Sequence, residues 1–285
     1  MAAANCNGYM TRWAGMMNWL VKEELADRNP CIGLRVADPV PVRDKRRPFS
    51  SDQLQRIFTG SPFDALKQPC PDGLTPANPS QFYVPLIALF SGLRQNEICQ
   101  QTTEDIAELD GVPCFIVKGD PSTGKRVKTA SSERIVPVHP VLVRAGLLDH
   151  HCRRCVSGET RLWPDLRPDR FGYASAYFSK WFARYLSQVD AKRERTSFHS
   201  FRHCFRDSLR AGGVERELAF ALGGWTGSRS GTVSVGDIYG SGFAISALHE
   251  AISRVSYDVA ALRPLILGVS SSSTPSVARP TMIDD

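Results

Sequence analysis

The sequence lacks long apolar runs, an export signal and any internal repeat. Its uncharged apolar segments, such as residues 83–90, are far shorter than the roughly 20 residues that a membrane-spanning helix needs. The N-terminal residues carry no basic flank, no compact apolar core and no small-residue cleavage site, so they do not form a secretory signal. We therefore predict a protein that has no membrane partner and stays in the cytoplasm.

Cysteine spacing gives no sign of a disulfide framework. The eight cysteines are Cys6, Cys31, Cys70, Cys99, Cys114, Cys152, Cys155 and Cys204. Cys99 and Cys204 lie within apolar helical patterns, as buried reduced thiols do. The sequence HHCRRC at 150–155 resembles half of a zinc site, but the chain has no second CxxC to complete the ligand set. We therefore expect a Cys- and His-rich helix end there, without a metal.

Charge and hydrophobicity are those of an ordinary globular protein, with 42% hydrophobic and 22% charged residues. The net charge of +6, from 35 Lys+Arg against 29 Asp+Glu, suits a polyanionic partner without proving one. The basic residues gather in two runs. These are Arg43, Lys45, Arg46 and Arg47, for which we predict a role in DNA binding, and Lys192, Arg193 and Arg195. A solvated surface or linker is the alternative for either run.

The N-terminal part of the chain is predicted to hold one helix and a linker. Apolar side chains at helical spacing predict a helix over 9–26, ended by Asn29-Pro30 because a residue before proline is pushed out of the helical region. A Pro-rich, charged linker covers 37–48. Ser50 then begins a helix as its N-cap, with Gln53 completing a capping box. The main domain is predicted over 49–268, followed by a disordered tail over 269–285.

Helical patterns dominate the main domain. They cover 82–99, with Gly92 as an interruption, and then 140–150, 173–188, 199–211, 214–222 and 243–255. Two short segments rich in β-branched residues, 115–118 and 134–138, flank a turn at 119–124 and predict a small antiparallel hairpin or sheet. The predicted fold class is α+β, mainly α-helical with a small antiparallel β-sheet.

The densest group of chemical side chains is HSFRH at 199–203, which opens a predicted helix. His199 and Arg202 are three residues apart and therefore lie on one helix face, where both can converge on one anion. The N-terminus of a helix adds a partial positive charge that favours a phosphate. Taken alone, the motif could equally be a surface helix capped by a histidine.

Four further positions hold residue types that suit phosphate chemistry. Arg94 follows the glycine break in an apolar helix, within the sequence SGLRQNEI, and Glu97 could orient it. Lys128 lies on the predicted hairpin, before the sequence RIVPVHP. Trp225 follows a pair of glycines, and Tyr239 stands fourteen residues after it. A structural Arg94–Glu97 ion pair and a tryptophan packed in the core are the alternatives for two of these positions.

In this order, Arg94, Lys128, His199, Arg202, Trp225 and Tyr239 resemble the catalytic residues of the tyrosine recombinase (phage integrase) family. The sequences SGLRQNEI, RIVPVHP with the KT before it, and HSFRH are similar to the family's as well, and the resemblance spans residues 46–255. It implies the tyrosine recombinase catalytic-domain fold. Residues 1–36 resemble the C-terminal helix of the family's core-binding domain, so we expect this chain to be part of a longer recombinase.

The resemblance implies that DNA strands are cut and rejoined through a 3′-phosphotyrosyl intermediate, with Tyr239 as the nucleophile. Negative charge builds up on the phosphate during attack, and the planar guanidinium groups of Arg94 and Arg202 match its oxygens. His199 is expected to accept or orient a proton, and Lys128 to protonate the leaving 5′ oxygen.

Two residues are expected to support this chemistry. Trp225 can donate its indole N–H to the phosphate, although it cannot exchange a proton as histidine does. His203 is expected to buttress the site. Because the phosphotyrosyl bond conserves energy, the reaction is expected to need no ATP. A covalent tyrosyl route is also expected to need no metal, and no other cofactor is expected.

Two assignments stay open. Lys125 is the alternative to Lys128 on the same hairpin, and Tyr257 is the rival of Tyr239. The Gly- and Ser-rich segment 226–236 precedes Tyr239. We therefore expect the pocket to be formed without DNA, and Tyr239 to be the part that moves.

The expected partner is double-stranded DNA, bound by a homotetramer that is a monomer without it. Residues 243–268 could pass to a neighbouring subunit, or Leu262, Leu265, Ile266 and Leu267 could fold back onto their own core. We favour an integrase of mobile DNA over a resolver of chromosome dimers. A type IB topoisomerase and a non-catalytic DNA-binding module are the alternative functions.

Overall fold

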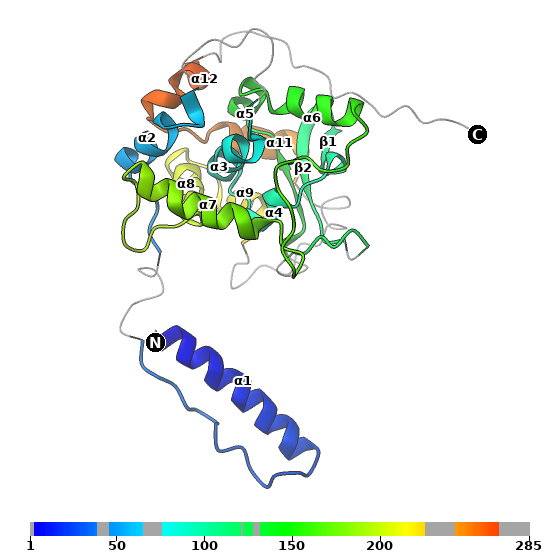
Figure 1. The fold of residues 1–285 in the computed structure, drawn as a ribbon, viewed down its shortest axis with the longest axis vertical. Helices are drawn as coiled ribbons and strands as arrows, with labels where there is room; N and C mark the ends of the chain where they lie inside the picture. The colour runs from blue at the N-terminus through cyan, green and yellow to red at the C-terminus, as the bar shows by residue number, and fades with distance from the viewer. Residues whose placement is uncertain are drawn as a thin grey trace, which may run out of the picture. The chain divides into compact units, whose positions relative to one another are not determined.

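The computed structural model describes residues 3–38, 46–64, 76–120, 122–127, 132–225 and 243–267. The chain divides into two compact units, Met1–Arg46 and Arg47–Asp285 (Figure 1). In the described part of the chain, no helix combines the length and the apolar character needed to span a membrane.

The first unit consists of helix α1 (Ala3–Lys22) and an extended segment that returns along it. The Asn7 side chain joins the two through a pair of hydrogen bonds, donating to the Val36 carbonyl and accepting from the Val36 N–H. The predicted helix over 9–26 is present, but it begins at Ala3 and ends at Lys22. The predicted end was wrong because Glu24 adopts a left-handed φ of 59°.

The second unit is built around α3 (Pro79–Ser91), which is buried on nearly every side (Figure 1). A helix that is apolar all round is stable only inside a core. The elements of this unit are α2 (Ser51–Thr59), α3, α4 (Gln95–Cys99), the 3₁₀ turn η3 (Thr103–Asp105), β1 (Ile106–Leu109), β2 (Val112–Val117), β3 (Arg134–Pro137), α5 (Pro140–Arg144), α6 (Leu147–Val156), α7 (Ser175–Gln188), α8 (Ser200–Ala211), α9 (Arg216–Gly223), α11 (Ile245–Ser253), η5 (Ala260–Leu262) and α12 (Arg263–Leu267).

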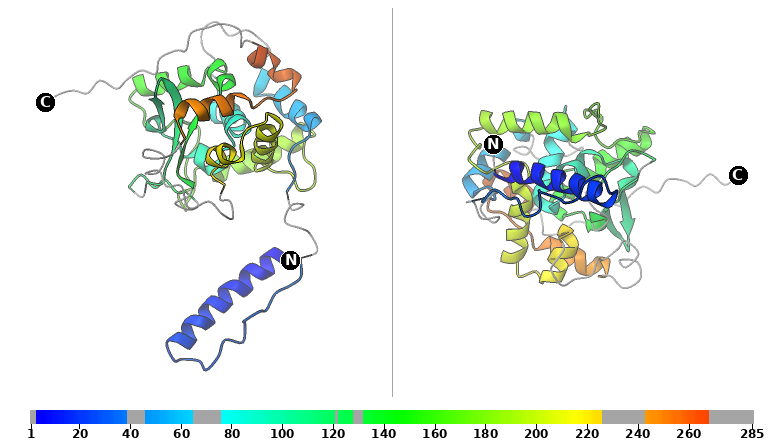
Figure 2. Two further views of the ribbon diagram at one scale, coloured as in Figure 1. Left: turned by 180° about the vertical axis from the view of Figure 1, so that it is seen from behind. Right: turned by 90° about the horizontal axis from the view of Figure 1, so that it is seen from below.

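The sheet has the order β1-β2-β3 and is antiparallel throughout. Phe115 of β2 pairs with Ile106 of β1 on one side and with Val136 of β3 on the other. Helix α11 packs against β3 and β2, as the view from behind shows (Figure 2). The predicted class, mainly α-helical with a small antiparallel sheet, is confirmed. The two predicted strands are present, and β1 is a third strand that the sequence did not predict.

Local sequence signals account for most element boundaries. Ser50 caps α2 and completes the predicted capping box with Gln53. The predicted helix over 82–99 is split into α3 and α4 at Gly92, and the predicted helix over 140–150 into α5 and α6 at Gly146. Both glycines have a left-handed φ, which costs glycine less than any other residue.

The C-terminal apolar group folds back onto its own unit. Leu262 and Leu265 are buried in the same core cluster as α3, and Ile266 packs against that cluster. The 3₁₀ turn η5 contacts α2, and α12 contacts α5. This is one of the two arrangements expected for the segment. The side chain of Leu267 and the predicted tail over 269–285 lie outside the described residues.

His139 is a buried histidine whose two ring nitrogens are both committed to the fold. Its Nδ1 accepts the Val141 N–H at the start of α5, at 3.1 Å, and its Nε2 donates to the Val255 carbonyl, at 3.0 Å. This pattern requires the neutral ring. Burial lowers the pKa of His139 to about 3, although the bond to Val255 acts in the opposite direction.

We expect His139 to make the fold sensitive to mild acid. Between pH 6.5 and about 3 the unfolded chain takes up a proton on His139 that the folded protein excludes, so the free energy of unfolding falls as the pH falls. At about 1.4 kcal/mol per pKa unit, the loss between pH 7 and pH 4 is about 3 kcal/mol. Urea unfolding at both pH values measures it. His139→Asn, which keeps a capping side chain, should lack this part of the loss, and an equal loss in both proteins would contradict the prediction.

Candidate active site

Arg94 is placed beside α8 by the glycine turn that ends α3. Gly92 has φ 63°, and a Cβ built on it would lie 2.2 Å from the Phe205 ring of α8. The two helices can therefore approach this closely only with glycine at this position. Arg94 itself is the N-cap residue of α4 and is partly exposed.

Glu97 holds Arg94 from within the same short helix. One carboxylate oxygen, Oε1, lies 2.5 Å from Arg94 Nη1, and the other, Oε2, accepts the Arg94 backbone N–H at 2.8 Å. Glu97 is only 5% exposed. Burial by itself would raise the pKa of this carboxyl group, but the Arg134 and Arg94 guanidinium groups lower it to about 2. Glu97 is therefore ionised throughout the neutral range.

Arg134 at the start of β3 shares the same carboxylate. Its Nη2 lies 2.9 Å from Glu97 Oε2, its Nε donates to the Leu222 carbonyl at 3.0 Å, and its Nη1 donates to the Ser132 carbonyl at 2.7 Å. It is 3% exposed. Arg134 is not among the site residues predicted from the sequence. A signal was present, since arginine opens an otherwise apolar strand, RIVP, and a charge there needs a buried partner.

Arg202 of α8 reaches the same cluster from the other side. Its two terminal nitrogens donate to the carbonyls of Gly92 and Gly223. Burial, followed by the nearby Arg134 and Arg94 guanidinium groups, lowers the pKa of Arg202 to about 9. The remaining N–H groups of Arg202 have no hydrogen-bond acceptor among the described residues.

The cluster of Arg94, Arg134, Arg202 and Glu97 holds three cations and one anion. Uncompensated charge with little access to water is costly unless a counter-ion is bound. An anion seated against Arg94 and Arg202 would supply that counter-charge, and guanidinium groups bind phosphate through paired hydrogen bonds. The arrangement is therefore suited to holding a phosphate group.

His199 precedes α8 and stands at its N-cap position, half-buried. Its ring meets the ring of His203 edge to face, with 5.3 Å between centroids. The description of His199 as a helix-capping side chain was wrong, because its side chain makes no cap hydrogen bond. The backbone there is already helical, with φ −62° and ψ −17°, whereas capping side chains belong to residues in the extended region.

Trp225 lies directly against the arginine cluster. The centre of its ring is 4.8 Å from Arg202 Cζ, a cation–π contact, and its ring also neighbours Phe205 and Phe220. Gly224 before it has a left-handed φ of 58°, and a Cβ built on it would lie 3.1 Å from the Arg134 guanidinium group. Trp225 therefore packs against apolar side chains and also contacts an arginine of the cluster.

Several residues proposed from the sequence lie outside the described residues. These are Lys128, Tyr239, Arg43 and Lys45. Arg46 and Arg47 are described and exposed. The Arg47 N–H donates to the Arg195 carbonyl at 3.1 Å, so Arg47 lies beside the second basic run.

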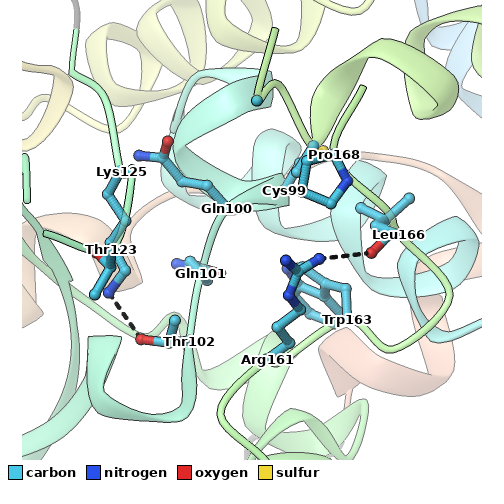
Figure 3. Close-up of a pocket in the computed structure, with 13 residues that line it drawn as sticks. Cys99, Gln100, Gln101, Thr102, Thr123, Lys125, Arg161, Trp163, Leu166 and Pro168 are labelled. Atoms are coloured by element: carbon cyan, nitrogen blue, oxygen red, sulfur yellow. Dashed lines mark hydrogen bonds between the residues drawn. The ribbon is translucent and has the colours of Figure 1, made fainter. Parts of the chain in front are cut away.

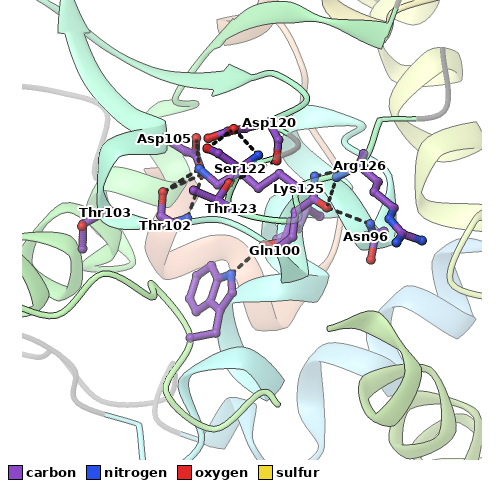
Figure 4. A network of polar contacts seen from close by, with 12 residues as sticks. Asn96, Gln100, Thr102, Thr103, Asp105, Asp120, Ser122, Thr123, Lys125 and Arg126 are labelled. Atoms are coloured by element: carbon purple, nitrogen blue, oxygen red, sulfur yellow. Dashed lines mark hydrogen bonds and ion pairs between the residues drawn. The ribbon is translucent and has the colours of Figure 1, made fainter. Parts of the chain in front are cut away.

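Lys125 and Tyr257, the two alternatives, both have partners within the fold. Lys125 is buried and pairs with Asp105 at 2.8 Å and with the Thr102 hydroxyl group at 2.8 Å (Figure 4). Tyr257 donates to the Leu89 carbonyl at 2.9 Å, and burial raises the pKa of its phenol well above the usual value. Both side chains are therefore engaged within the fold, which suits neither a proton donor nor a nucleophile that must reach a bound phosphate.

A small pocket lies beside Lys125, between the end of α4 and the loop that leads to α7 (Figure 3). Gln101 lines it, and the Oε1 atom of this buried side chain has no hydrogen-bond partner among the described residues. Arg94, Arg202 and Trp225 are not among the lining residues. The pocket is therefore separate from the arginine cluster.

The Cys- and His-rich segment forms most of α6. His150 and His151 each bond a backbone carbonyl through Nε2, at Leu162 and Thr103 respectively, both at 2.8 Å. Across the part of the chain that the structure describes, no group of three or more His, Cys, Asp or Glu side chains is arranged to hold a metal ion.

The sequence matches no family model and no curated protein. Among solved structures, the chain is similar to the XerH site-specific recombinase bound to a palindromic difH substrate, with TM-score 0.54, 15% identity, and 80% of this chain and 62% of that chain covered. It is also similar to the Tn1549 transposon integrase in complex with a circular intermediate DNA, with TM-score 0.52, 14% identity, and coverage of 90% and 80%. For a lambda integrase dimer bound to a COC′ core site the values are 0.52, 14%, 79% and 71%.

These likenesses establish the architecture. The second unit of the chain has the tyrosine recombinase catalytic-domain fold, as the sequence resemblance implied. At 14–15% identity they are evidence of fold alone, so any activity must be argued from this chain's own residues.

Proposed function

We propose that this chain is the catalytic part of a site-specific DNA recombinase that cuts and rejoins strands through a 3′-phosphotyrosyl intermediate. The observation that carries the proposal is the arginine cluster, in which Arg94 and Arg202 lie close enough for their charges to interact and positive charge is in surplus. Structural neighbours with this fold are bound to DNA, whose strands are linked by phosphodiesters.

In the proposed reaction Arg94 and Arg202 bind the two non-bridging oxygens of the scissile phosphate. Tyr239 attacks phosphorus, so that a Tyr–O–P bond forms as the P–O5′ bond breaks. Lys128 gives a proton to the departing 5′ oxygen, and His199 accepts or orients the proton of the tyrosine. Attack by the free 5′ hydroxyl group reverses these steps and rejoins a strand.

The remaining residues have supporting roles in the proposal. Trp225 closes the arginine cluster against water through its contact with Arg202. Glu97 holds Arg94 in place, and His203 supports His199 through their ring contact. Electrostatic stabilisation by preorganised groups of this kind is usually the largest contribution to such catalysis.

The proposed partner is double-stranded DNA, bound in the cytoplasm by a homotetramer that assembles on it. Residues 1–36 would be the end of a core-binding domain, 37–48 a linker and 49–268 the catalytic domain. Arg47, which is hydrogen-bonded to the basic segment that contains Arg195, would contact DNA phosphates together with Arg43, Lys45 and Arg46. Integration of mobile DNA is the role that we favour.

A nicked DNA substrate should trap the protein covalently, and Tyr239→Phe should abolish the trapping. The substrate is a duplex with the junction sequence at which the element meets its host DNA, nicked near the cleavage position so that the freed fragment escapes. Without the phenolic oxygen no phosphotyrosyl bond can form, so adduct on a denaturing gel should fall at least a thousandfold. Tyr257→Phe is the matched control and should retain its adduct.

Each outcome separates the competing functions. Adduct with Tyr239→Phe but not with Tyr257→Phe would make the nucleophile assignment wrong. DNA binding without adduct on any junction substrate would favour the non-catalytic binding module. Relaxation of supercoiled plasmid without strand exchange between two duplexes would favour the type IB topoisomerase. The adduct should also form in excess chelator, because no step of the proposed route uses a metal.

A further inference from the structure

The Arg134 guanidinium group is held by three acceptors that belong to the protein itself. It is 3% exposed and donates to Glu97, to the Leu222 carbonyl and to the Ser132 carbonyl. Gly224 covers its guanidinium group, and a Cβ at that position would lie 3.1 Å from it. Arg134 is therefore enclosed by protein, and it can influence a bound phosphate only through the groups that it holds.

Two of these groups, the Glu97 carboxylate and the Leu222 carbonyl, connect Arg134 to the two arginines proposed to bind the phosphate. Through Glu97, Arg134 reaches Arg94, since the carboxylate gives Oε1 to one guanidinium group and Oε2 to the other. Through the Leu222 carbonyl it reaches the last turn of α9, where the next carbonyl, that of Gly223, accepts from Arg202. Arg134 thus joins the element that carries Arg94 to the turn that holds Arg202.

Packing alone does not account for an arginine at this position. A buried ion pair is often no more stabilising than apolar side chains of similar volume. An arginine also fixes the orientation of its partners, because its planar guanidinium group can hold one carboxylate and two carbonyls in a single geometry. Glu97 held by Arg94 alone could rotate toward Arg94 and draw its guanidinium group away from the phosphate.

We infer that Arg134 is a positioning residue, which sets the direction of the Arg94 guanidinium group by holding the opposite oxygen of Glu97. The inference rests on the proposed function, in which Arg94 binds the scissile phosphate. Arg134 itself does not contact the substrate.

Tungstate, a stable mimic of phosphate, provides a probe that needs no knowledge of the DNA target. Its affinity for the full chain is measured by isothermal titration calorimetry for the wild type, Arg134→Lys, Glu97→Gln and the double variant. Arg134→Lys keeps the charge but loses the fork, and should weaken tungstate binding about tenfold. In the Glu97→Gln background the same change should matter less than twofold, because the route through the carboxylate is already broken.

A merely structural role would give a different result. If Arg134 served only packing, Arg134→Lys would weaken binding by the same factor in both backgrounds, and this outcome would overturn the inference. Arg254→Lys is the matched control, an arginine-to-lysine change at a half-exposed ion pair with Glu250, and should leave tungstate affinity unchanged.

A second variant covers the case in which Arg134→Lys does not fold. Glu97→Asp keeps the charge but withdraws the carboxylate by one methylene, so it cannot reach Arg94 and Arg134 together. Its tungstate affinity should fall by a similar factor, and an unchanged affinity would also overturn the inference. In the folded variants, the side-chain Nε–H signal of Arg94 in ¹⁵N relaxation experiments should show increased motion.

The trapping experiment separates failure of this inference from failure of the proposed function. Coupling between Arg134 and Glu97 without a DNA adduct would keep the inference, as a property of an anion site, and remove the recombinase. An adduct together with equal factors in both backgrounds would keep the recombinase and overturn the inference. A wild-type chain that binds no tungstate would overturn the inference whatever the DNA result.

Discussion

Replacing Arg202 with lysine is expected to slow DNA cleavage by about a hundredfold to a thousandfold, the usual effect of removing one preorganised donor from a charged transition state. Arg202 donates to the carbonyls of Gly92 and Gly223 and still has N–H groups free of acceptors among the described residues. A lysine has one nitrogen on a flexible stem. It cannot serve both carbonyls and still present donors to a phosphate.

The single-turnover rate of adduct formation on the nicked junction duplex measures this effect. Arg206→Lys is a close control, because Arg206 lies one turn later on α8 and its half-exposed side chain pairs weakly with Asp207, at 3.8 Å. That change should alter the rate less than twofold. Equal rates for Arg202→Lys and the wild type would show that the cluster does not carry the phosphate.

The stability of Arg202→Lys should also fall, but by much less than its activity. One buried carbonyl, at Gly92 or Gly223, would lose its donor, which costs about 1–3 kcal/mol. Circular dichroism in urea can therefore show that the variant is folded under the assay conditions. A loss of activity explained by unfolding would appear there first.

The sequence predicts the interior of this fold better than its edges. The apolar character of 82–99 was enough to predict a helix with a break at Gly92, and Ser50 with Gln53 marked a helix start that the structure confirms. Strand β1 was missed because its four residues, IAEL, are too few to show a period. Its pairing with β2 depends on a two-residue turn at Asp110 and Gly111, both in the left-handed region.

The candidate site shows a similar division. Arg94 and Glu97 are three residues apart, so their contact follows from helix geometry. Arg134 and Glu97 are separated by 37 positions, and no local rule connects them. His199 shows the opposite case, since the helix-capping histidine was an alternative offered by a local rule, and the backbone conformation prevents the capping hydrogen bond.

The tertiary contacts also bear on the two alternatives that the sequence left open. Lys125 and Lys128 lie on the same predicted hairpin, and no pattern separates them. Lys125 forms a buried ion pair with Asp105. This engagement within the fold favours Lys128 as the proposed general acid. Tyr257 is engaged in the same manner by the Leu89 carbonyl, which supports Tyr239.

Glu97→Ala is expected to lower the free energy of unfolding by about 3–5 kcal/mol, the usual cost of removing one partner from a buried ion pair. Among the residues that the structure describes, Glu97 supplies the only carboxylate paired with these arginines, and without it Arg134 stays buried beside Arg94 and Arg202 with no described counter-charge. Urea unfolding at pH 7 measures the loss. Glu250→Ala, which breaks a half-exposed pair with Arg254, should cost less than about 1 kcal/mol.

The pH dependence of the same variant tests the physical cause. The folded pKa of Glu97 is lowered from 4.5 to about 2 by the two arginines, so the stability that it contributes is present above pH 4.5 and is lost as the pH falls toward 2. The difference between wild type and Glu97→Ala should therefore be constant from pH 7 to pH 5 and shrink below pH 4.5. A difference that stayed constant down to pH 3 would mean that lost packing, and not lost charge, destabilises the variant. In that case the surplus positive charge would not be what prepares the cluster for a phosphate.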